Sequence, residues 1–265
     1  MLASVSRDEI GESSVKWLCK AVEKGLDKLV LDQIRVSDKN HLPELFQQLE
    51  SSSSLRHLTI VSVNLASNPH VFESFLLYLK SATSLVGLKL QNNNFKSRHI
   101  LRITEALAEN RELQDCDLGF NKLCRKEQDT NTLILRNLAI FVHNDVNLRH
   151  LSLQGMHLSL AIEEETELVK KVDTGGQSAK KAAGKEEKKG AKAKKEKGEP
   201  KKQEETAEMP ENSFESLIEV LADSNSLQCV HLSGNGFSGE QIGYIQNKFG
   251  IRTDGSSQHS KERVI

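Results

Sequence analysis

Hydrophobic residues along the chain follow two alternating patterns. In six segments they recur three and four positions apart, the spacing that gives a helix one buried face. These positions are Val15, Leu18, Cys19 and Val22; Leu42, Leu45, Phe46 and Leu49; Phe72, Phe75, Leu76 and Leu79; Ile100, Ile103 and Leu107; Leu135, Leu138, Ala139 and Val142; and Phe214, Leu217, Ile218 and Leu221. Each segment precedes a leucine-rich run with the alternation of a half-buried strand. The chain therefore predicts a series of helix–strand units.

The leucine-rich runs share the motif LxxLxLxxNxL, which repeats along the chain. The strict copies begin at Leu85, Leu113 and Leu227 and carry Asn93, Asn121 and Asn235. The looser copies begin at Leu26, Leu55 and Leu148 and carry Ile34, Val63 and Met156 in place of the asparagine. Self-similarity at a fixed period is typical of a solenoid, in which neighbouring units bury a shared core. Because asparagine would hydrogen-bond the turn backbone, we expect the looser turns to be less regular.

The spacing between segments locates two insertions. The interval from strand start to next helix is 15 to 17 residues in the first three copies, then 22 and 66. The excess predicts about six extra residues near 125–130 and about fifty extra residues after the fifth copy. Apolar positions Ile242, Ile245 and Phe249 predict a final helix, so we expect the array to start and end with a helix.

The unit of 28 to 30 residues resembles the ribonuclease-inhibitor-type leucine-rich repeat, over roughly residues 12–250 apart from the insertions. The resemblance implies an α/β fold, a leucine-rich repeat solenoid in the form of a short horseshoe. Strands pack ~4.8 Å apart whereas helices need ~8–10 Å, so the array must bend with a parallel concave sheet inside and convex helices outside. We expect six strands.

The expected organisation has five parts. These are an N-terminal tail (1–11), repeats one to five (12–162), a disordered Lys/Glu-rich insertion (163–211), the last repeat with its C-terminal helix (212–252) and a C-terminal tail (253–265).

Side chains between the strand leucines should face the concave surface, because directions alternate along a strand. Proteins that resemble this family commonly bind other proteins there, so a non-catalytic interaction scaffold is our leading hypothesis. The predicted partner-binding residues are Lys28, Asp32, His57, Thr59, Lys89, Gln91, Asp115, Asp117, His150, Ser152, Gln154 and His231, with Phe120 as an exposed apolar anchor. The alternatives are an ordinary solvated strand surface and, for Phe120, packing beneath the rim.

The long insertion combines 13 lysines with 13 acids, so its charges nearly cancel. Such a composition favours disorder. Its basic stretch could bind an acidic partner or nucleic acid, act as an import signal, or be a passive solvated loop. The candidate electrostatic residues are Lys180, Lys181, Lys188, Lys189, Lys194, Lys195, Lys201 and Lys202.

An enzyme is the least favoured class. The sequence contains no phosphate-binding loop or zinc motif, and we expect no cofactor and no metal. One group of side chains is a candidate for an acid–base or metal cluster, namely Asp115, Asp117, His150 and His231. The spacing of these residues does not support such a cluster. Cys116 replaces a core leucine and is interpreted as a buried apolar residue.

Composition and resemblance set the remaining expectations. The net charge is −1, no apolar stretch is long enough for a membrane span, and the opening residues lack a secretory apolar core. We expect no membrane association, a monomer by itself, and a cytoplasmic location, with nuclear, cytoskeletal or ciliary locations as alternatives. The family resemblance leaves open regulation of a small GTPase or of actin assembly.

Overall fold

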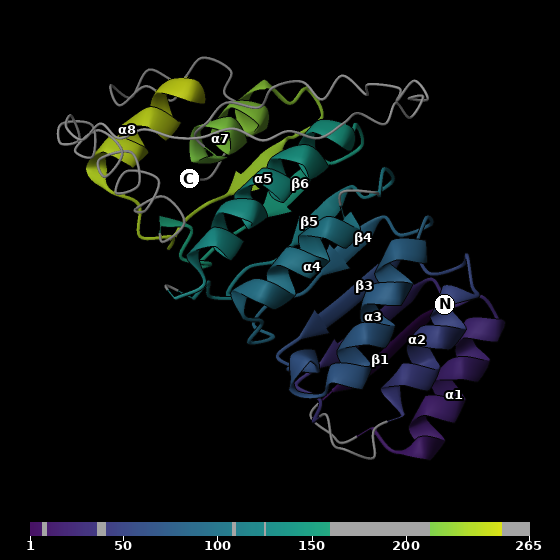
Figure 1. The fold of residues 1–265 in the computed structure, drawn as a ribbon. Coiled ribbons are helices and arrows are strands. Elements are labelled where there is room, and N and C mark those ends of the chain that lie inside the picture. The colour runs from purple at the N-terminus through teal and green to yellow at the C-terminus, as the bar shows by residue number, and fades with distance from the viewer. Residues whose placement is uncertain (7–9, 36–40, 108–109, 125, 160–212, 251–265) are drawn as a thin grey trace, which may run out of the picture.

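The computed structural model describes residues 1–6, 10–35, 41–107, 110–124, 126–159 and 213–250 (Figure 1). The predicted Lys/Glu-rich insertion with its eight candidate lysines, and the predicted C-terminal tail, lie outside these residues.

The sheet has seven parallel strands whose spatial order is their order in the chain. They are β1 (Leu2–Ser6), β2 (Lys28–Asp32), β3 (His57–Val61), β4 (Gly87–Lys89), β5 (Asp115–Asp117), β6 (His150–Ser152) and β7 (Cys229–His231). Consecutive strands pair without exception, so each new unit adds to the edge formed by the previous one. This order is characteristic of a repeat-like α/β solenoid.

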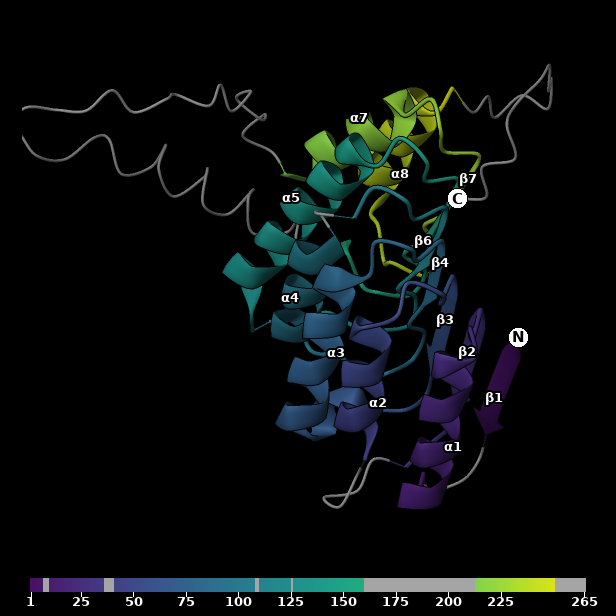
Figure 2. The same cartoon turned by 90° about the vertical axis from the view of Figure 1, so that its right-hand side faces the viewer.

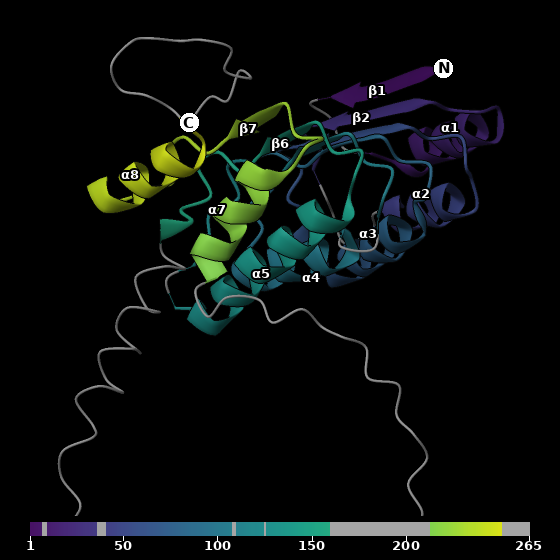
Figure 3. The ribbon, with the colours of Figure 1, turned by 90° about the horizontal axis from the view of Figure 1, so that it is seen from above.

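Helices connect the strands and cover one face of the sheet, while no described helix covers the other face (Figures 2 and 3). They are α1 (Glu12–Glu23), α2 (Leu42–Glu50), the 3-10 turn η1 (Leu65–Ser67), α3 (Pro69–Ser81), α4 (Ser97–Leu107), α5 (Gln128–Asn144), α7 (Ser213–Asp223) and α8 (Gly239–Lys248). Each of the six predicted apolar helix faces lies in a helix of the structure, and the predicted final helix is α8, which contains Ile242 and Ile245 and ends just before Phe249. Asn68 caps α3, accepting hydrogen bonds from the backbone N–H groups of His70 and Val71.

The core lies between sheet and helices and is built from register-matched apolar columns. The central column runs through Leu29, Leu58, Leu88, Cys116, Leu151 and Val230, which are paired in turn across the sheet. All of them are buried. Burial also raises the pKa of the Cys116 thiol, with a further rise from nearby carboxylates, so the residue is a buried apolar side chain as predicted.

Strand β1 corrects the prediction of an N-terminal tail over residues 1–11. Leu2–Ser6 pairs in parallel with β2, so the sheet has seven strands rather than six and the array begins with a strand rather than a helix. The two side chains directed at the core are Ala3, which is buried, and Val5, which is partly buried. Because neither is leucine and no LxxLxL motif precedes them, the repeat pattern gave no signal there.

Helix α5 corrects the short insertion predicted near 125–130. The helix begins at Gln128 and runs for 17 residues, so part of the extra sequence lengthens the helix instead of forming a loop. Asn131, inside this extension, is buried and donates to the carbonyl of Cys124.

Buried asparagines connect the turns at the carboxyl ends of the strands. The Asn121 amide donates to the carbonyls of Leu90 and Leu118, and its oxygen accepts from the N–H groups of Asn93 and Phe95. Each such side chain therefore joins its own turn to the turn of the preceding unit, which supplies partners for backbone groups that water cannot reach.

Candidate protein-binding surface

The open face of the sheet carries two complete rows of side chains, one residue per strand. The first row from β2 to β7 is Lys28, His57, Gly87, Asp115, His150 and Cys229; the second is Val30, Thr59, Lys89, Asp117, Ser152 and His231. Apart from Gly87, all of these are exposed or half-buried. The remaining predicted residues, Asp32, Gln91 and Gln154, are half-buried at or just past the strand ends. We call this face the concave surface.

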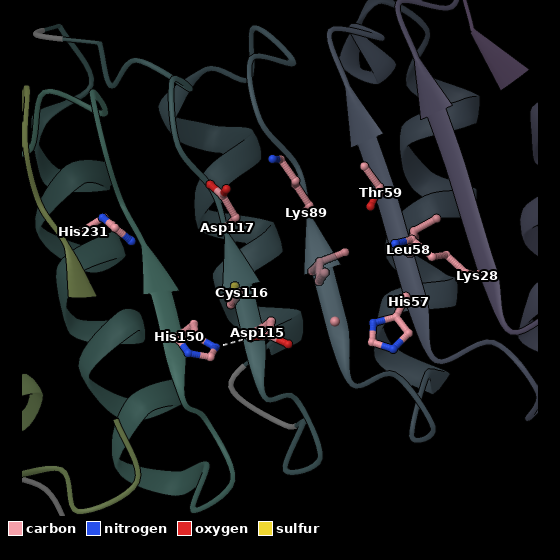
Figure 4. Close-up of a pocket in the computed structure, with 12 residues that line it drawn as sticks. Lys28, His57, Leu58, Thr59, Lys89, Asp115, Cys116, Asp117, His150 and His231 are labelled. Carbon is pink, nitrogen blue, oxygen red and sulfur yellow. Dashed lines mark hydrogen bonds and ion pairs between the residues drawn. The ribbon is translucent and has the colours of Figure 1, made fainter. Parts of the chain in front are cut away.

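A shallow hollow of about 290 Å³ lies in the middle of the concave surface, with lining residues from β2 to β7 (Figure 4). Its lining includes Gly87 together with His57, Lys89 and Asp115. Gly87 is the only residue of the first row without a side chain, and a Cβ placed there would lie 2.5 Å from Nδ1 of His57. The missing side chain therefore makes room for the His57 ring and opens the hollow at its centre.

On the β5–β6 side of the hollow, the acidic groups are satisfied by neighbours. Asp115 pairs with Nδ1 of His150 (Figure 4). The Asp117 carboxylate accepts from Nε2 of Gln91 at 2.6 Å and from the N–H of Gly119 at 3.0 Å. Both carboxylates thus take part in the surface's own hydrogen-bond network.

The four residues considered as an acid–base or metal cluster are not brought together. Asp115 and His150 meet, whereas His231 contacts the Cys229 sulfur at 3.2 Å on the last strand. In Figure 4 the His231 ring lies well away from the Asp115–His150 pair. Within the described ranges, no three His, Cys, Asp or Glu side chains are grouped closely enough to hold a metal ion.

The β2–β4 side of the hollow differs because its polar groups have no such partners. Lys28, Lys89 and His57 make no hydrogen bond or ion pair with another described residue, and neither does the Thr59 hydroxyl. The concave surface therefore has one half whose polar groups pair with each other and one half whose donors have no partner among the described residues.

Phe120 lies at the rim, in the turn that follows β5. Its side chain is 43% exposed, and its φ of 60° is left-handed, which is unfavourable for a bulky residue. The equivalent positions carry Gln33, Ser62, Asn92, Gly155 and Gly234, all with positive φ. The Phe120 ring rests on the next turn, because a Cβ added to Gly155 would lie 2.9 Å from Cδ1 of the ring. Phe120 is thus both exposed and held in place.

Sequence reasoning missed Gly87, because only polar and aromatic residues were considered as binding residues. A signal was present: the equivalent positions of the other repeats carry Lys28, His57, Asp115, His150 and Cys229. A glycine among such side chains indicates a local hollow.

No helix in the described part of the chain has the length and apolar character that spanning a bilayer requires.

Comparisons with known proteins give likenesses among solved structures. No protein-family model matches the chain, and no curated protein matches it. Among solved structures, the chain is similar to "Leiomodin-1 Actin-Binding Site 2 (ABS2)", with a TM-score of 0.39 and 16% sequence identity. The match covers 63% of this chain and 99% of that one. Similarity at this level carries no argument about what this chain binds.

Proposed function

We propose that this chain is a non-catalytic leucine-rich repeat scaffold that binds a protein partner on its concave surface and rim. The observation that carries the proposal is the open sheet face itself: two rows of exposed and half-buried polar side chains cross β2 to β7, while the helices cover the opposite face. The LxxLxLxxNxL motif, in register with these strands, supports the family assignment.

The chemistry of this surface suits recognition of a protein. The concave surface is continuous, mostly polar and mixed in charge, and it has an exposed aromatic side chain at one edge. Aromatic residues are enriched among the energetically important residues of protein interfaces. The left-handed φ at Phe120 is shared by every equivalent turn, so the presence of a bulky aromatic at this position, where other repeats carry Gly, Asn, Ser or Gln, is what adds support. The non-enzymatic part of the proposal rests on the open, separately paired arrangement of Asp115, Asp117, His150 and His231.

Affinity capture with surface variants tests the proposal. Ser152→Glu and His150→Glu change side chains of the concave surface, and Glu50→Lys is the control at the end of α2 on the helix face. We expect the two concave variants to lose the captured partner about tenfold or more, and Glu50→Lys to retain it.

Deletion of residues 177–202 separates this function from electrostatic binding by the lysine-rich insertion. Scaffold binding survives the deletion. Binding to nucleic acid through lysines would instead show a steep salt dependence that the deletion abolishes. Retention of the partner by both concave variants would overturn the proposed function.

A further inference from the structure

The hollow at Gly87 has a chemical asymmetry that points to the kind of residue it receives. On its β5–β6 side, Asp115 and Asp117 already accept hydrogen bonds from His150, Gln91 and the Gly119 N–H. On its β2–β4 side, positive and hydrogen-bonding groups line the same hollow without described partners.

Resting on the proposed function, we infer that the hollow seats a carboxylate from an acidic segment of the protein partner, between β2 and β4. The groups that would receive it are the Lys28 and Lys89 ammonium groups, the His57 imidazole and the Thr59 hydroxyl, all of which line the hollow. Each can donate a hydrogen bond to a carboxylate oxygen, and the two lysines supply the complementary charge.

The arrangement of these residues suits one carboxylate better than a broad charged surface. Lys89 and Thr59 are register partners on the adjacent strands β4 and β3. His57 is the register partner of Gly87 in the first row of side chains, and its ring lies beside Gly87. Because Gly87 has no side chain, the His57 ring can lie over this position on β4, which brings the ring beside Lys89 and Thr59 in the hollow. A side chain at position 87 would displace the ring from this place.

Nearby acids in the described ranges form no ion pair with the two lysines of the positive side. Asp117 faces Lys89 across β4 and β5, but its two oxygens accept from Gln91 and from the Gly119 N–H, and it forms no ion pair with Lys89. Asp115 is paired with His150. An acidic partner group therefore meets donors on one side and already occupied acceptors on the other, which also fixes its position against Asp115 and Asp117 by like-charge repulsion.

Nuclear magnetic resonance of the full chain tests this inference at residue resolution, which separates the hollow from the lysine-rich insertion. The probes are a seven-residue peptide with two glutamates among alanines and glycines, and its counterpart with two glutamines. We expect the glutamate peptide to cause saturable shifts of the Thr59, Gly87 and Lys89 amides, and the glutamine peptide to cause none there.

Variants sharpen the titration. The double substitution Lys28→Gln with Lys89→Gln should weaken glutamate-peptide binding at the hollow about fivefold to tenfold, as expected for two partly exposed ion pairs. The control Lys80→Gln, which removes one exposed charge from α3 on the helix face, should leave it unchanged. Equal shifts with both peptides, an absence of shifts at these amides, or full binding by the double variant would overturn the inference.

The same double variant in the capture experiment distinguishes a failure of the acidic-segment inference from a failure of the proposed function. If His150→Glu releases the partner while the Lys28 and Lys89 substitutions leave it bound, the concave scaffold stands and the acidic-segment inference fails. If all concave variants retain the partner, the proposed function itself fails, and the inference fails with it.

Discussion

The turns after β4, β5 and β7 differ from those after β2, β3 and β6 in one buried position. The first three carry Asn93, Asn121 and Asn235, and the others carry the apolar residues Ile34, Val63 and Met156. We expected the second group to be irregular. The structure shows instead that the N–H of Val63 donates to Asn93 and the N–H of Met156 donates to Asn235.

This comparison shows that an asparagine serves the turn before it as well as its own. In a repeat without the asparagine, a backbone N–H of the turn is still hydrogen-bonded when the following repeat carries the asparagine. The turns after β3 and β6 are examples. The loss of one buried asparagine should therefore disturb two units, whereas the loss of an exposed asparagine should disturb little.

Asn121→Ala should have the largest effect on stability. The side chain is fully buried and joins the turns of β4 and β5, so its removal leaves the carbonyls of Leu90 and Leu118 and two N–H groups without partners. We expect the free energy of unfolding to fall by about 3–4 kcal/mol, measured by urea denaturation followed by circular dichroism.

The matched control for that loss is Asn147→Ala. Asn147 also joins two units, donating to the carbonyl of Arg111, but it is partly exposed and water can replace it. The expected loss is about 0.5–1 kcal/mol. Equal losses in the two variants would contradict the distinction between buried and exposed asparagines.

The turns at the opposite ends of the strands offer a second contrast, between Asn110 and Asp145. Both are buried and accept backbone N–H groups, but Asn110 also donates to the carbonyl of Ala82, whereas Oδ2 of Asp145 has no hydrogen-bond partner among the described residues. Burial raises the pKa of Asp145 to about 6, despite hydrogen bonds from the backbone of Asn147 and Leu148 that lower it.

Asp145→Asn should stabilise the protein at pH 7 by about 1–3 kcal/mol, because it removes a buried charge. The folded-state pKa of Asp145 lies above the unfolded value of about 3.9, so between these two values the folded chain binds more protons than the unfolded chain. The free energy of unfolding therefore falls as the pH rises through 6 and Asp145 becomes ionised. The gain should therefore shrink as the pH is lowered from 7 to 4 in urea titrations. A gain that is independent of pH would contradict this assignment.

Phe120→Gly separates stability from binding. Glycine takes a positive φ without strain, as Gly155 and Gly234 do at the equivalent positions, so we expect a gain of about 0.5–1 kcal/mol in the free energy of unfolding. Capture of the partner should nevertheless fall about tenfold through loss of the exposed ring. A variant that is destabilised but still binds fully would show that Phe120 is a structural residue.

His99 should give the smallest effect, through pH. Burial and the charge of Arg98 lower the pKa of this histidine, which packs on Phe72 and accepts from the N–H of Lys96. Below about pH 6.5 the unfolded chain takes up a proton that folded His99 resists, so stability falls as the pH drops.

His99→Gln is the control variant for this effect. Glutamine can accept from the same N–H but does not titrate. Its stability relative to the parent should improve by a few tenths of a kcal/mol between pH 7 and pH 5. An unchanged difference across this range would contradict the role of His99.

The solenoid could be predicted from the sequence because its signal is periodic. Leucines such as Leu58, Leu88 and Leu151 recur at fixed intervals and occupy one buried column in the structure. Strand β1 could not be predicted, because Ala3 and Val5 lack the leucine motif and pair only through their backbone with β2. The family assignment stays a proposal.

The side-chain directions of the candidate surface followed from strand alternation, but its chemistry did not. Alternation placed Asp115 and His150 on one face, while their pairing depends on the register between β5 and β6. The hollow at Gly87 depends on which side chains neighbouring strands bring together, and these strands are about 30 residues apart in the sequence. The same holds for the donors of the β2–β4 side, which have no partner among the described residues.

Hydroxyl-radical footprinting of the captured complex tests the central claim most directly, because it reports side-chain exposure on both faces at once. Phe120, His57, His150 and His231 are partly exposed on the concave surface and its rim, whereas Trp17 and Leu77 are exposed on helices α1 and α3. The account predicts that oxidation of the first group falls several-fold on binding while that of Trp17 and Leu77 is unchanged. Protection of Trp17 and Leu77 with continued oxidation of the concave histidines would contradict it.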